Sequence, residues 1–79
     1  MTVAEAREQV RETAKRVSEA RDELVAAGRH ATYTRGTQCS GALKRLDRAT
    51  YAFDSAVEDL VRDRKLLEGA IYQGLQGGQ

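Results

Sequence analysis

The sequence predicts an all-α protein, an antiparallel two-helix hairpin with coiled-coil-like packing that dimerises into a helical bundle. Its 79 residues include no proline, no tryptophan and one phenylalanine, a composition that favours helices over sheets. Two segments carry apolar residues at alternating spacings of three and four, which is typical of helices that pack along one seam. A chain of this size rarely builds a sufficient core alone. We therefore expect at least a homodimer, built from one helical-hairpin domain over residues 1–79.

The first helix is predicted over residues 3–28. Thr2 and Glu5 have the spacing of a capping box, in which each side chain satisfies a backbone amide at the helix start. Two heptad rows follow, with larger residues in one and small residues in the other: Val3, Val10, Val17 and Leu24, then Ala6, Thr13, Ala20 and Ala27. Small side chains let a facing helix approach closely. Gly28 is expected to end this helix.

Residues 29–39 lack a helical period and are predicted to connect the helices. The second helix is predicted over residues 40–75, with glycines stopping it and a flexible tail over residues 76–79. Its seam is read from the spacing of Leu43, Leu46, Thr50, Phe53, Val57, Leu60, Arg64, Leu67, Ile71 and Gly74. Laid antiparallel on the first helix, this seam places Phe53 opposite Val17 and Arg64 opposite Ala6. Phe53 should then be the most buried large side chain.

A second apolar stripe beside that seam is the predicted self-association surface. It consists of Ala42, Ala49 and Ala56. The second helix is also longer than the first, so its end should overhang and expose Ile71, Tyr72 and Leu75 for the same contact. A four-helix bundle formed by two chains follows from this stripe.

Basic residues gather around the connection, although the chain as a whole has 13 basic and 12 acidic residues and a net charge of +1. This basic tip, as a candidate partner-binding surface, comprises Arg29, His30, Tyr33, Arg35, Lys44, Arg45 and Arg48. Such a cluster can contact an anionic protein surface or the phosphates of a nucleic acid. It is equally the pattern of a solvated loop beside surface arginines.

Catalysis is not expected, and neither is a cofactor or a metal. Cys39 and His30 are the one nucleophile and base pair, but no residue is placed to orient His30. One cysteine and one histidine cannot supply a tetrahedral zinc site. The lone cysteine also excludes an internal disulfide, and no apolar run approaches the roughly 20 residues that span a bilayer. We therefore expect a soluble, cytoplasmic protein.

The function predicted is that of a non-enzymatic protein interaction module. It would act as a small adaptor, an assembly component or an inhibitor of another protein, and a viral or mobile-element factor is one possible origin. The alternative is a hairpin that binds nucleic acid through its basic tip, with salt-sensitive and weakly sequence-dependent affinity. The sequence contains no recognisable family motif.

Overall fold

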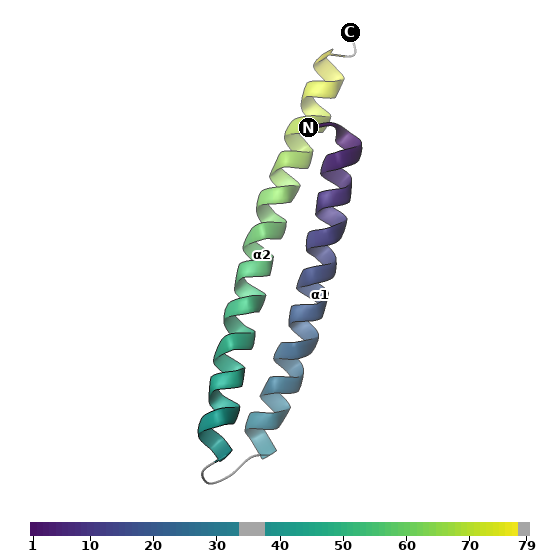
Figure 1. The fold of residues 1–79 in the computed structure, drawn as a ribbon. Coiled ribbons are helices and arrows are strands. Elements are labelled where there is room, and N and C mark those ends of the chain that lie inside the picture. Colours follow the sequence, from purple (N-terminus) through teal and green to yellow (C-terminus); the bar gives the residue numbers. More distant parts are fainter. Residues whose placement is uncertain (34–37, 78–79) are drawn as a thin grey trace.

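The computed structural model of the chain, which describes residues 1–33 and 38–77, is a two-helix hairpin. Helix α1 spans Val3–Tyr33 and helix α2 spans Gln38–Gly77. The helices run antiparallel along their whole shared length, so the molecule is a thin rod with the start of α1 and the end of α2 at the same end (Figure 1). Its Cα atoms extend over 66 × 13 × 13 Å. The predicted all-α hairpin is confirmed.

The start of α1 is the predicted cap. The amide of Glu5 donates a hydrogen bond to Oγ1 of Thr2 at 3.1 Å, and the amide of Ala6 donates to the Thr2 carbonyl at 2.9 Å. A side-chain acceptor at this position satisfies one of the amides that a helix start leaves unpaired. Thr2 thus lies immediately outside the helix, which begins at Val3.

The predicted end of the first helix is wrong, because α1 continues through Gly28 to Tyr33. A glycine inside a helix costs only about 1 kcal/mol relative to alanine. Beyond it, Ala31 lies seven residues after Leu24 and is partly buried, so the seam extends past the glycine. Thr32 also donates its hydroxyl to the Gly28 carbonyl at 2.9 Å. Packing of the next turn therefore outweighs the local preference.

Helix α2 also exceeds its predicted bounds, beginning at Gln38 and including Gly74 and Gly77. At 1.5 Å per residue, α1 is about 46 Å long and α2 about 60 Å. The extra turns of α2 pass the start of α1 at one end of the rod (Figure 1). Ile71, Tyr72 and Leu75 are all exposed on this part of α2, as the predicted overhang requires.

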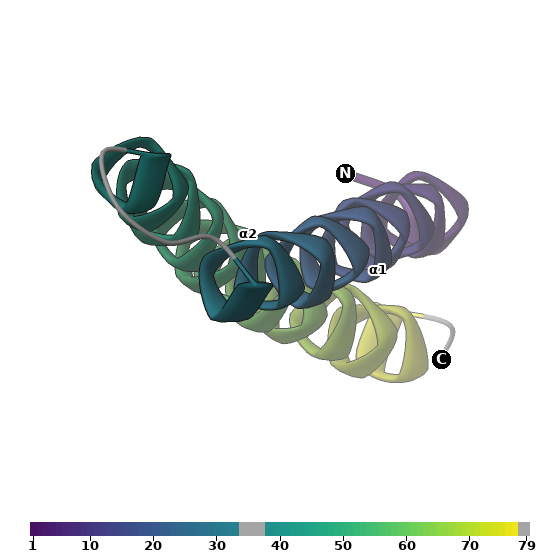
Figure 2. The same cartoon turned by 90° about the horizontal axis from the view of Figure 1, so that it is seen from below.

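The contact between the helices is a seam along which they wind about each other, as the view along the rod shows (Figure 2). Heptad repeats predict this winding, because a straight helix would carry a seven-residue row away from its partner. On α1 the two predicted rows are confirmed. The small row is the more buried, with Ala6, Thr13 and Ala27 at most 1% exposed, while the four larger residues are partly buried.

On α2 one of the two predicted rows is displaced by a single residue. The row of partly buried large residues is confirmed: Leu46, Phe53, Leu60 and Leu67. The other row, however, is Ala42, Ala49, Ala56 and Asp63, with exposed fractions of 0, 4, 7 and 8%. Leu43, Thr50 and Arg64, which had been assigned to the seam, are exposed instead, and Val57 is partly buried.

Both helices therefore contribute a small row and a large row to the seam. Within the described part of the chain, every buried apolar residue is an alanine, and Phe53 is only partly buried. Two cylinders that touch along one line can enclose only the side chains on that line, so small residues are buried and larger ones cover them from the flanks. Phe53, which was expected to be the most buried large side chain, is for this reason partly buried, as Leu46, Leu60 and Leu67 are.

Candidate interaction surface

The basic tip contains one organised contact, between Arg45 of α2 and Glu23 of α1. Nε of Arg45 donates to Oε1 of Glu23 at 2.7 Å, and an amino group of the same guanidinium donates to Oε2 at 3.1 Å. A further nitrogen of Arg45 lies 3.4 Å from Nδ1 of His30. The hydrogen bonds from Arg45, followed by its charge, lower the pKa of Glu23, and those to Glu23 raise the pKa of Arg45. Arg45 thus joins the two helices and is not directed at an external partner.

The other basic residues of the tip do not converge. Arg29 follows the buried Ala27 by two positions, and Lys44 follows the buried Ala42 by two. Two positions correspond to about 200° around a helix, so the two side chains lie on opposite outer edges of the rod. Arg48 and Tyr33 are exposed, and Arg35 lies outside the described residues. The described part of the predicted basic tip is therefore dispersed, and it presents no single phosphate-binding patch.

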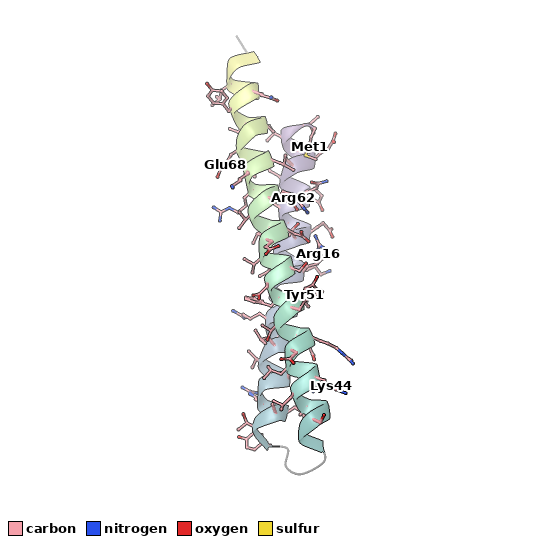
Figure 3. The ribbon with its side chains drawn as sticks, turned by 90° about the vertical axis from the view of Figure 1, so that its left-hand side faces the viewer. Met1, Arg16, Lys44, Tyr51, Arg62 and Glu68 are labelled. Carbon is pink, nitrogen blue, oxygen red and sulfur yellow. The ribbon has the colours of Figure 1, made fainter. Side chains whose placement is uncertain are left out.

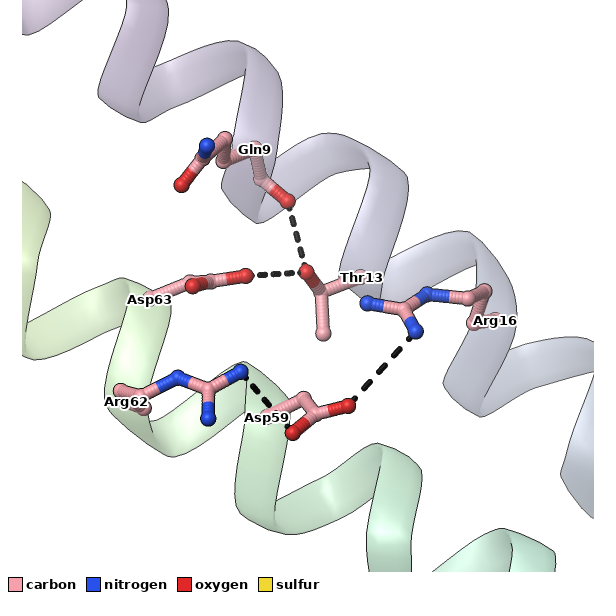
Figure 4. A network of polar contacts seen from close by, with 6 residues as sticks. All are labelled: Gln9, Thr13, Arg16, Asp59, Arg62 and Asp63. Carbon is pink, nitrogen blue, oxygen red and sulfur yellow. Dashed lines mark hydrogen bonds and ion pairs between the residues drawn. The ribbon is translucent and has the colours of Figure 1, made fainter.

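A polar layer formed by Thr13 and Asp63 interrupts the alanine seam. Oγ1 of Thr13 lies 2.7 Å from the Gln9 carbonyl and also hydrogen-bonds Oδ2 of Asp63 across the seam (Figure 4). Both residues are buried, at 1% and 8% exposed. The hydroxyl has one hydrogen, so it donates to one of these two oxygens at a time. No buried side-chain nitrogen or oxygen among the described residues lacks a hydrogen-bond partner.

Charged residues cover this layer on one side. Asp59 lies between two arginines, 3.6 Å from Arg16 of α1 and 3.0 Å from Arg62 of its own helix (Figure 4). The neighbouring hollow, of about 480 Å³, is open to solvent and lined by Met1, Gln9, Glu12, Thr13, Arg16, Arg62, Asp63 and Leu66. The carboxylate of Asp59 thus neutralises much of the charge of the two arginines. The buried layer of Thr13 and Asp63 is suited to fixing the alignment of the helices, because a shifted alignment would leave its polar atoms without partners.

Asp63 is not among the residues singled out from the sequence. The signal was present, since 42, 49, 56 and 63 continue one heptad row. Assigning the buried polar position to Arg64 displaced that row by one residue. No group of three or more histidine, cysteine, aspartate or glutamate side chains that could hold a metal ion occurs among the described residues.

The cross-helix ion pairs define the two flanks of the rod. Arg16 and Glu23 each precede a large seam residue on α1, and their partners Asp59 and Arg45 each precede one on α2. These four residues form the paired flank. The opposite flank consists of the residues that follow the small seam row on each helix. Glu68 lies on one side of α2, and Arg62 and Arg16 lie on the other (Figure 3).

Five of the six exposed valine, leucine and isoleucine residues that the structure describes lie on that opposite flank, which we call the outer face. The sixth, Leu66, lies on the paired flank, and the exposed tyrosines lie off the outer face. On α2, Leu43 and Ile71 each directly follow a residue of the small row. Val61 and Leu75 lie one turn beyond Val57 and Ile71 on the same side. On α1, Val25 lies one turn beyond Arg21, which follows the small-row residue Ala20. These five large residues, Val25, Leu43, Val61, Ile71 and Leu75, are 38 to 71% exposed, and the partly buried Val57 lies among them. An apolar strip along one side of a rod is the form of a protein contact surface.

The residues predicted for self-association thus divide into two groups. Ala42, Ala49 and Ala56 are buried against α1 within a single chain, so they are unavailable to a second chain while the hairpin is intact. Ile71 and Leu75 are exposed on the outer face, and Tyr72 is exposed on the overhang. The alanine row that was predicted to mediate dimerisation lies in the seam. The row that begins at Leu43, which was predicted to lie in the seam, lies outside it. Whether the chain self-associates stays a prediction.

Two further observations bear on the class of protein. Neither described helix holds an apolar stretch long enough to cross a bilayer. No family model, curated protein or solved structure matches this chain.

Proposed function

We propose that this protein is a non-enzymatic protein interaction module that binds another polypeptide along its outer face. It would serve as an adaptor, an assembly component or an inhibitor. The observation that carries this proposal is that five of the six exposed valine, leucine and isoleucine residues that the structure describes, from both helices, lie on a single side of the rod. An equal number of apolar residues scattered around the rod would have indicated nothing.

The thin core of the hairpin supports the same proposal. Its large apolar residues are only partly buried, because two helices can enclose little between them. A third helix on the outer face would cover Val57 and the exposed residues around it. At about 25 cal/mol for each Å² of apolar surface removed from water, a long helical contact would stabilise both the complex and the hairpin itself.

Site-specific crosslinking can test this proposal. A photo-crosslinking residue is placed at Val61, in the middle of the outer face, and separately at Ala52, which is exposed and precedes the large seam residue Phe53 on the paired flank. We expect crosslinks to protein from position 61 and few from position 52. Equal yields at the two positions would show that the outer face is not a preferred binding surface.

A substitution gives a second readout of the same surface. Val61→Glu places a charge in the outer face but outside the seam, so the hairpin should remain helical by circular dichroism while the crosslinked or co-purified protein is lost. Ala52→Glu is the matched control and should retain it.

A further inference from the structure

We infer that the occupant of the outer face is a second copy of this chain, arranged with α1 of each copy over α2 of the other and both hairpins pointing the same way. This inference rests on the proposed function and names its partner. It also differs from the sequence prediction of a dimer, because the contact uses the outer face and leaves the alanine row inside each hairpin.

The first argument is that the two halves of the outer face have opposite charge. The α1 half carries Arg7, Arg11 and Arg21 and no acidic residue. The α2 half carries Asp47, Asp54 and Glu68, with Arg64 as its one basic residue. Arg7, Asp54 and Glu68 form no ion pair within the described part of the chain, and Arg21 has only a 4.0 Å contact with its neighbour Asp22. These charges are available to another molecule.

The second argument is that oppositely charged residues lie at the same height on the rod. The contact between Arg16 and Asp59 sets the alignment. Arg21 lies five residues after Arg16, and Asp54 lies five residues before Asp59. In antiparallel helices these steps run in the same direction, so Arg21 and Asp54 are level.

The same relation holds near the other end of the rod. The hydrogen bond between Thr13 and Asp63 sets the alignment there. Arg7 lies six residues before Thr13 and Glu68 lies five residues after Asp63, so these two differ in height by about one residue. The charge pattern is therefore matched at two points about four turns of helix apart. By the same count Arg11 is level with Arg64, but Arg11 already pairs with Glu8 of its own helix at 3.6 Å, so two attractive contacts stand against one weakened repulsive one.

Symmetry then selects one arrangement. A two-fold axis parallel to the rod keeps every residue at its own height and places α1 of one copy over α2 of the other. Arg21 of each copy then meets Asp54 of the other. Arg7 likewise meets Glu68, so each pair occurs twice. A two-fold axis across the rod would place α1 over α1 and bring the arginine rows together, which like-charge repulsion disfavours.

The size of the outer face fits a stable dimer. The part of this face that both helices form is about 46 Å long and 13 Å wide, so two copies would bury roughly 1,200 Å² between them, the lower end of the range for an interface of standard size. Val25, Leu43, Val57, Val61 and Ile71 would occupy its centre, with the charged residues beside them. This is the usual anatomy of an apolar core within a polar rim.

A charge-exchange experiment tests the arrangement. Arg21→Glu and Asp54→Arg are made in separate chains, and each homodimer then has like charges facing at two points. Each should dimerise about tenfold or more weakly than the parent by sedimentation equilibrium, since repulsion replaces attraction twice. An equimolar mixture should form a heterodimer by native mass spectrometry. In it the new carboxylate of the Arg21→Glu chain faces the new guanidinium of the Asp54→Arg chain, and the unchanged Asp54 of the first chain faces the unchanged Arg21 of the second.

Controls lie on the opposite side of the rod. Glu19→Arg and Arg48→Glu change exposed charges outside the outer face and should leave the dimer unaltered. Circular dichroism checks that every variant keeps its helices.

Two results would overturn this inference. One is a parent protein with the mass of a single chain, 8.7 kDa, at about 100 μM, where even a weak interface forms. The other is a dimer whose two charge variants do not prefer each other. Crosslinks from position 61 to a different protein would then leave the proposed function standing, whereas equal crosslinking from positions 61 and 52 would remove the proposed function itself.

Discussion

Two adjacent rows of α2 differ by one residue in the sequence and have opposite environments. Ala42, Ala49 and Ala56 are buried, while their successors Leu43 and Thr50 are exposed and Val57 is partly buried. The larger and more apolar row therefore lies outside. In a rod of two helices, burial depends on how closely the helices approach, and small side chains permit the closest approach. Side-chain size, more than hydrophobicity, decides which row enters the seam.

The largest expected effect is that of a charge in the small row. Ala49→Glu should destabilise the hairpin by about 3 kcal/mol or more, because it both overfills the seam and buries an unpaired carboxylate. Since a domain of this size has little more stability than that, the variant should be largely unfolded by circular dichroism. Ser55→Glu, exposed on the same helix, is the control and should fold normally. A folded Ala49→Glu monomer would mean that the alanine row lies outside the seam.

A smaller loss is expected in the large row. Phe53→Ala should cost about 2 to 3 kcal/mol, below the range for a fully enclosed aromatic site, because Phe53 is only partly buried and little cavity remains. Tyr51, two residues away, is 77% exposed, so Tyr51→Ala should change stability by less than about 0.5 kcal/mol. Urea unfolding followed by circular dichroism measures both. Equal losses would contradict the assignment of Phe53 to the seam.

The polar layer provides a sharper comparison within the small row. Thr13→Val removes the hydroxyl and leaves the buried Asp63 carboxylate without its partner, which should cost about 1 to 2 kcal/mol. The double variant Thr13→Ala, Asp63→Ala extends the alanine row on both helices and should be at least as stable as the parent. A double-mutant cycle from urea midpoints isolates the coupling.

The same double variant tests whether the layer fixes the alignment of the helices. A spin label on each helix should report one distance in the parent and a broader distribution when the layer is gone. An equally narrow distribution in both proteins would show that the alanine row alone determines the alignment.

The smallest expected effect concerns the paired flank. Hydrogen bonds from Arg45 lower the pKa of Glu23 below its ordinary value of 4.5. Because the folded-state pKa is the lower one, the ion pair stabilises the hairpin above about pH 4.5, and this contribution is lost as the pH falls through the lowered pKa. Glu23→Gln should therefore lower the urea midpoint slightly at pH 7 and make no difference in strong acid.

Exposure and salt keep this effect small, since both groups are in contact with solvent. Glu19→Gln, an exposed glutamate that has no ion pair within the described residues, is the control and should show no such pH dependence. A Glu23→Gln effect that persists unchanged at pH 3 would indicate that the carboxylate charge is not its cause.

The sequence by itself determined the class, the number of helices, the cap at Thr2 and both rows of α1. The cap follows from local chemistry. The rows of α1 follow from the heptad period, because only one pair of rows in that helix can form a seam. The second helix allows two assignments of the seam. Both include the row of Leu46, Phe53, Leu60 and Leu67, and they differ by one residue in the position of the other row. Hydrophobicity favoured Leu43 and Val57 over Ala42 and Ala56, and on that basis the wrong row was assigned to the seam.

Only the tertiary structure decided between these two assignments, because the choice depends on how closely α1 approaches α2. The small row of α1 allows a close approach, and a close approach admits Ala42, Ala49, Ala56 and Asp63 but not their larger successors. The same contact carries α1 past Gly28, because Ala31 adds a further seam position. It also places Asp63 against Thr13 and leaves the large apolar residues of the outer face exposed. Periodicity specifies which residues can share a face, whereas the partner helix determines which of two possible faces is buried.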